Sequence, residues 1–197
     1  MDRDFRSDEE VEWLESIGVA VLNHSEIENV FLSEGVLRTV ADHLQLADDF
    51  EGLLEKAQGL VFRELSTDRE TLVSSITATK IERDLKKFDA KARGKAGLDA
   101  ALGNLTSFIE VDTYYDETAT EVDRVVAEQD YAKALRLHNN KGLLGKIEPL
   151  FGFARRGMPG LVKRLASAKE DAAVLAAIRE ELPKVQAWVP LTIRRSP

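Results

Sequence analysis

Hydrophobic residues follow two different spacings along this chain, and the change lies near residue 48. The run GVAVL at 18–22 is short, apolar and rich in β-branched residues, which is typical of a β-strand. From Asp48 onward, apolar residues recur at the spacing of one face of an α-helix. The pattern therefore predicts strand and helix in the first part of the chain and helices in the rest.

Local signals place the ends of two helices in the first part. Ser7, followed by acids at 8–10, is typical of a helix start, because the hydroxyl can accept from a free backbone N–H and acids favour the positive end of the helix dipole. Gly18 is expected to end this helix. Ser33 and Glu34 predict the start of the second.

The remainder of the chain is predicted to be helical with one interruption. Glycine and proline residues at 141–160 indicate a loop-rich stretch, followed by a last helix that ends near Leu182. We accordingly divide the chain into residues 1–46, a helical insertion or interaction region at 47–137, and a loop-rich and helical segment at 138–197 that returns to the first region.

Two acidic pairs stand next to the predicted strands. Asp2 and Asp4 would follow a strand that ends at Met1, and Glu26 and Glu28 follow the GVAVL run. Alternate residues of an extended segment project to the same side, so each pair can aim two carboxylates at one point. In parallel sheets, ligands bind beyond the carboxyl ends of the strands. We therefore predict an α/β fold, with a parallel βαβα unit at the front and an acidic site at the sheet edge.

Composition narrows the chemistry. The 197 residues are 44% hydrophobic, enough for a core, and no apolar run reaches the length of about 20 residues that spans a bilayer. The acidic N-terminus is unlike a signal peptide, so a cytoplasmic protein without membrane contact is expected. There is no cysteine, so a metal must be held by oxygen or histidine. The three histidines, His24, His43 and His138, lack metal-ligand spacing.

Charge is unevenly distributed. The formal net charge of −8 argues against extensive coating of nucleic acid. Residues 80–95 are nevertheless rich in lysine and arginine, whereas Arg124 is the only base among residues 110–130. The basic run is either a contact for nucleic-acid phosphates or the solvated side of a helix.

Three short motifs together resemble the Toprim nucleases of the OLD type. They are Asp2-Arg3-Asp4, the segment SEIENVFL at 25–32, and HNNKGLLGKI at 138–147. The resemblance implies that Asp2, Asp4 and Glu28 hold Mg²⁺ or Mn²⁺. It also implies that Lys141 is the active-site lysine, with Glu28 as the other catalytic residue. Glu26 stands where these relatives often have serine, so its part in the metal site is open.

The resemblance also implies a biological setting. Such Toprim domains usually follow an ABC-like ATPase in the same polypeptide and cut DNA in ATPase-coupled systems such as phage defence. Expected partners are therefore DNA, an upstream ATPase domain or subunit, and a second copy of the chain. A Toprim domain also needs an acidic residue after an earlier strand, so we expect this chain to be the C-terminal part of a longer protein and catalytically incomplete alone.

Each functional interpretation has a structural alternative. The acids at 2 and 4 are otherwise a solvated terminus, Glu28 and Asn29 are residues that cap or brace a turn, and Lys141 is an ordinary loop lysine. For the whole chain the alternative is a non-enzymatic helical module, in which the segments after Asp48 bind a partner or a second copy.

Overall fold

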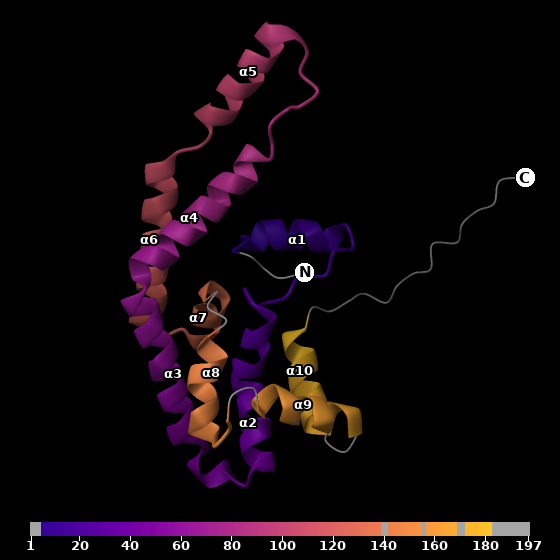
Figure 1. The fold of residues 1–197 in the computed structure, drawn as a ribbon, viewed down its shortest axis with the longest axis vertical. Coiled ribbons are helices and arrows are strands. Elements are labelled where there is room, and N and C mark those ends of the chain that lie inside the picture. The colour runs from indigo at the N-terminus through magenta and orange to yellow at the C-terminus, as the bar shows by residue number, and fades with distance from the viewer. Residues whose placement is uncertain (1–4, 139–141, 155–156, 169–171, 183–197) are drawn as a thin grey trace, which may run out of the picture.

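The computed structural model describes residues 5–138, 142–154, 157–168 and 172–182, and every regular element in these ranges is a helix (Figure 1). The α-helices are α1 (Asp8–Ser16), α2 (Glu34–His43), α3 (Phe50–Thr67), α4 (Arg69–Leu85), α5 (Gly94–Ser107), α6 (Val111–Glu128), α7 (Tyr131–Leu137), α8 (Leu143–Ile147), α9 (Gly157–Ala168) and α10 (Ala172–Glu181). Short 3₁₀ helices are η1 (Ile27–Leu32), η2 (Ala47–Asp49) and η3 (Glu148–Phe151).

The predicted α/β fold is wrong: the described part of the chain is all-α and contains no strand. Residues 19–22 form neither strand nor helix, and Val21 and Leu22 are buried. A strand needs a neighbour to complete its backbone hydrogen bonds, and the described ranges offer no second extended segment. The apolar run is explained instead by its burial among helices.

Several helix ends were predicted correctly. The hydroxyl of Ser7 accepts from the backbone N–H of Glu10 at 3.2 Å, and the Glu10 carboxylate accepts from the N–H of Ser7 at 2.9 Å. This reciprocal capping box starts α1, and Gly18, with φ of +85°, follows its end. The prediction that residues 141–160 are rich in loops is wrong in part, because they include α8 and η3.

The core lies where α3 meets its neighbours. Helix α3 contacts α2, α4, α6, α7 and α8, and α10 packs on α2. The largest fully buried apolar side chains are Phe50, Leu32, Leu37, Leu65, Leu135, Leu143, Ile147 and Met158. They come from all three predicted segments, so one core includes residues of 1–46, 47–137 and 138–197, while the division itself stays a prediction.

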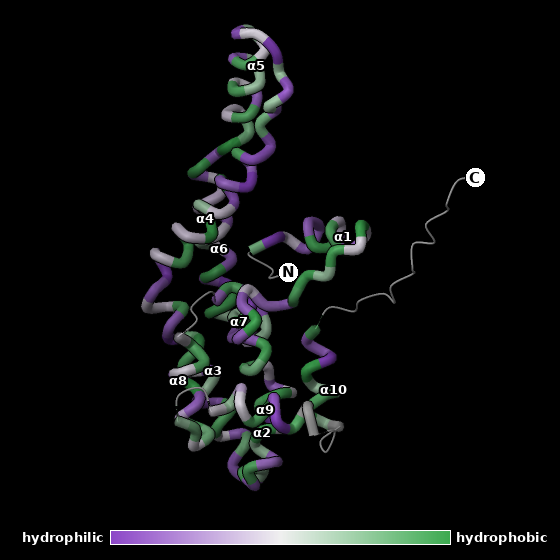
Figure 2. Tube along the Cα trace, turned by 45° about the vertical axis from the view of Figure 1, so that its right-hand side comes forward, coloured by the Kyte–Doolittle hydropathy of each residue, from purple (hydrophilic) through white to green (hydrophobic). Residues whose placement is uncertain are grey.

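An arm, which we define as residues 85–112, projects from this body. Helices α4 and α6 lie side by side and carry α5 at the far end, as Figure 1 shows. Helix α5 has no buried residue. The tube in Figure 2 has hydrophobic positions along α5, away from the core. The arm is thus a surface feature with apolar side chains that the body does not cover.

Candidate functional site

Ser25 and Asn29, in the SEIEN motif, hold the end of α7. The side-chain amide of Asn29 donates to the carbonyl oxygens of Leu135 at 3.0 Å and His138 at 2.7 Å. The hydroxyl of Ser25 donates to the same His138 oxygen at 2.6 Å. Carbonyls at a helix end lack partners within the helix, and these two buried side chains supply them. The motif is therefore fixed to the chain that leads into HNNKG.

The same motif faces the start of the chain. Ser25 and Glu26 line a cavity of about 340 Å³ together with Phe5 and Arg6. Phe5 directly follows Asp4 in the sequence. Three segments consequently meet at one junction. Residues 5–6 follow the first motif, residues 25–29 lie within the second, and residues 135–138 lead into the third.

The predicted site residues are only partly described. Asp2, Asp4 and Lys141 lie outside the described residues. Glu26 is the N-cap of η1 and Glu28 lies within it, and both are half-buried. The expectation that Glu26 and Glu28 project to the same side assumed an extended backbone at both residues, but only Glu26 is extended and Glu28 lies in the 3₁₀ helix.

A metal site is not complete within the described residues, which include no group of three or more histidine or acidic side chains placed to hold an ion. Mg²⁺ is commonly held by one or two carboxylates, with water and substrate phosphate as its other ligands. Glu26 and Glu28 are the described carboxylates of the predicted site, and their oxygens are donors of the kind that Mg²⁺ or Mn²⁺ takes.

His24 links the junction to the last described helix. Its Nε2 lies 2.9 Å from Oε2 of Glu181 in α10, while its buried Nδ1 has no partner in the described part of the chain. The hydrogen bond from His24 is the main reason that the pKa of Glu181 lies below its ordinary value. Sequence spacing gave no sign of this pair. Near by, burial lowers the pKa of His138.

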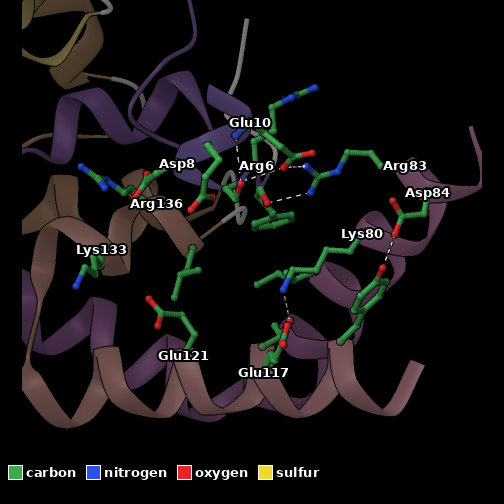
Figure 3. A pocket seen from close by; sticks show the side chains of 17 residues that line it. Arg6, Asp8, Glu10, Lys80, Arg83, Asp84, Glu117, Glu121, Lys133 and Arg136 are labelled. Atoms are coloured by element: carbon green, nitrogen blue, oxygen red, sulfur yellow. Dashed lines mark hydrogen bonds and ion pairs between the residues drawn. The ribbon is translucent and has the colours of Figure 1, made fainter. Parts of the chain in front are cut away.

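A second cavity, of about 540 Å³, lies between the start of α1 and helices α4, α6 and α7 (Figure 3). Arg83 reaches into it and donates to Glu10 at 2.5 Å and to the carbonyl of Phe5 at 2.9 Å. The ammonium of Lys80 donates to the hydroxyl of Thr118 at 2.8 Å. The lining mixes acids and bases, so it does not select a strongly charged ligand of either sign.

Tyr114 and Asp84 form a polar contact at the base of the arm. The phenol donates to Oδ2 of Asp84 at 2.5 Å, and this bond is the main cause that raises the pKa of Tyr114 to about 12. Burial raises the pKa of Asp84, but hydrogen bonds from Lys87 and Tyr114 outweigh it, and the net pKa is lowered. The contact fixes the end of α4 to the start of α6.

Part of the basic run is paired within the chain. Arg83 binds Glu10, Lys86 lies 2.8 Å from Glu82, and Lys87 lies 2.6 Å from Asp84. Lys80 donates to Thr118, and the other three bases, Lys91, Arg93 and Lys95, are exposed on the arm. The structure thus separates a structural half of the run from a half that faces solvent.

No protein-family model, curated protein or solved structure matches this chain. Within the described ranges, no helix combines the length and apolar character needed to cross a membrane. The OLD-type Toprim family and the Mg²⁺ or Mn²⁺ cofactor therefore stay predictions from the sequence motifs.

Proposed function

We propose that the junction of residues 5–6, 25–29 and 135–138 belongs to the metal site of a nuclease that hydrolyses DNA phosphodiesters. The observation that carries the proposal is this convergence. Asp4 directly precedes the first segment, Glu26 and Glu28 lie in the second, and Lys141 follows the third by three residues. The Asn29 and Ser25 bonds to His138 join two of these segments across more than a hundred residues of sequence.

The chemistry requires few groups. Carboxylates of Asp2 or Asp4 and Glu28 would hold Mg²⁺ or Mn²⁺, which activates water and neutralises charge on the scissile phosphate. Lys141 would stabilise charge that develops on the phosphate. The proposal keeps this chemistry from the OLD-type resemblance and does not include the parallel sheet. DNA as substrate and an ABC-like ATPase as partner are supported by the resemblance alone.

Metal binding is the first test, because it does not depend on activity. The chain is titrated with Mn²⁺ by calorimetry, beside Asp4→Asn and Glu28→Gln, with Asp48→Asn as a control at an exposed acid away from the junction. We expect saturable binding that either junction variant abolishes and the control retains. Equal binding by all four proteins, or none by the parent, contradicts the proposal.

Cleavage is the second test. The assay is cleavage of supercoiled plasmid with Mn²⁺ or Mg²⁺. Lys141→Ala should slow single-turnover cleavage far more than it weakens DNA binding. Lys146→Ala is the control, since Lys146 pairs with Glu64. A Lys141 variant that cuts at the parental rate removes this residue from the site.

A helical interaction module is a second candidate, favoured by a different observation. Helix α5 has no buried residue, and Phe108 at its end is 74% exposed. Exposed apolar side chains gathered on a projecting element are typical of a docking surface. This function does not depend on the acids of the junction and is compatible with the first.

A further inference from the structure

Helix α5 lacks the packing that normally keeps a helix folded. Its 14 residues include Gly94, Gly97 and Gly103, and none of its side chains is buried. Isolated helices of this length are marginal in water, and glycine weakens them further. Apolar side chains exposed on the arm are Leu98 (43%), Leu102 (52%), Phe108 (74%) and Val111 (54%). The helix therefore needs a surface to pack against.

The arm also has room for such a surface. An open cavity of about 740 Å³ lies between α5, the end of α4 and the start of α6. Its lining includes Asp84 and Tyr114 from those two helices, and the small residues Ala92, Gly97, Ala100 and Ala101 from α5 and the turn before it. Small side chains let a second helix approach closely, and the neighbouring leucines could then pack against it.

The two ends of α5 carry opposite charge. Lys91, Arg93 and Lys95 stand at its N-terminal end, are exposed, and form no ion pair with the described residues. Glu110 and Asp112 follow its C-terminal end and are also exposed. The helix dipole adds positive charge to the first end and negative charge to the second. Each end thus attracts the opposite end of an identical helix.

We infer that α5 packs antiparallel against α5 of a second copy, about a two-fold axis at the middle of the helix. With the axis between Ala100 and Ala101, Arg93 at the N-cap of one α5 lies opposite Phe108 at the C-cap of the second, where the guanidinium can stack on the ring. Glu110 follows Phe108 by two residues and is the acid next to this Arg93. Every contact occurs twice, as in any isologous dimer.

The charges favour a second copy over nucleic acid. A phosphate backbone would neutralise the three bases at one end, but it would be repelled by Glu110 and Asp112 and would leave Phe108 exposed. A copy of the same arm satisfies both ends and covers the apolar side chains. This inference is independent of the nuclease proposal, because it uses no residue of the junction.

The test is charge reversal with mixing, followed by sedimentation velocity of the full chain. Arg93→Glu and Glu110→Arg should each raise the dimer dissociation constant by about tenfold or more, because like charges then oppose each other at two points. An equimolar mixture of the two variants should restore the dimer, since both contacts become Glu–Arg pairs. The double variant should restore it as well. Lys163→Glu, an exposed site on α9, is the control.

The outcomes are distinct. Recovery on mixing cannot come from misfolding, because each variant is present in the same form as when it is tested alone. A parent that is monomeric at all concentrations, or a dimer that all the variants keep, overturns the inference. If Arg93→Glu changes only the affinity for a DNA duplex and the parent is a monomer, the arm binds nucleic acid and the inference is wrong.

Discussion

Asn29 binds the carbonyl oxygen of His138 at 2.7 Å although the two residues are 109 positions apart. The same amide reaches Leu135, so one side chain satisfies two carbonyls at the end of α7. Because Asn29 begins the buried part of η1, the bond ties the first quarter of the chain to the region before Lys141. The SEIEN motif, for which the sequence predicts metal binding, therefore has a structural role in holding the end of α7.

Replacing Asn29 with alanine should destabilise the fold. The change removes two buried hydrogen bonds, and Leu135 loses its closest side-chain donor, so we expect a loss of about 1–3 kcal/mol in the free energy of unfolding. Urea denaturation measures it. Asn23→Ala is a matched control, because Asn23 is exposed in the same loop. Equal stability of the two variants would show that the Asn29 hydrogen bonds do not contribute to the free energy of unfolding.

Local patterns predicted much of the helical structure. The capping residues at 7–10 and the helical spacing after Asp48 depend only on residues a few positions apart in the sequence. Helices α1 and α3 could therefore be predicted. A buried β-branched run has the same local pattern whether it pairs with strands or packs under helices, so 18–22 was misread. The contacts of Asn29 with His138 and of His24 with Glu181 join remote positions, and periodicity cannot reveal them.

Arg83 should anchor α1 to α4. Helix α1 has no buried residue, and the guanidinium binds both Glu10 and the carbonyl of Phe5. In Arg83→Ala we expect faster hydrogen exchange at the α1 amides with little change in global stability, because the core is not touched. Lys86→Ala, which removes an exposed pair with Glu82, should leave exchange in α1 unchanged. If the α1 amides exchange at the same rate in Arg83→Ala as in Lys86→Ala, Arg83 does not anchor α1.

Glu148 should support the start of α9. Its side chain is buried, and Oε1 accepts from the backbone N–H of Met158 at 3.0 Å. Glu148→Ala leaves that donor without its partner and opens a cavity, so we expect a loss of about 2–4 kcal/mol in the free energy of unfolding. Glu148→Gln keeps a side chain of the same length with an acceptor oxygen, so the free energy of unfolding should fall less than in Glu148→Ala. Thermal and urea unfolding compare them, and a glutamine variant as unstable as alanine would argue that charge matters more than the bond.

Glu181 should make stability depend on pH through its contact with His24. The hydrogen bond from His24 lowers the pKa of Glu181 below its ordinary value of 4.5, with burial opposing the shift and Ser33 and Arg136 adding to it. A carboxyl whose folded-state pKa is lowered stabilises the protein above its unfolded-state pKa, and this stabilisation is lost as the pH falls through the folded-state pKa.

Glu181→Gln should therefore lose about 1–2 kcal/mol at neutral pH, because a charged acceptor is replaced by a neutral one. Its unfolding free energy should also fall less steeply than that of the parent as the pH drops below 4.5. Urea denaturation from neutral pH to pH 3.5 measures both. Glu180→Gln changes an exposed neighbour on α10 and should follow the parent. If the Glu181 and parent curves stay parallel throughout, the His24 contact does not carry the pH dependence.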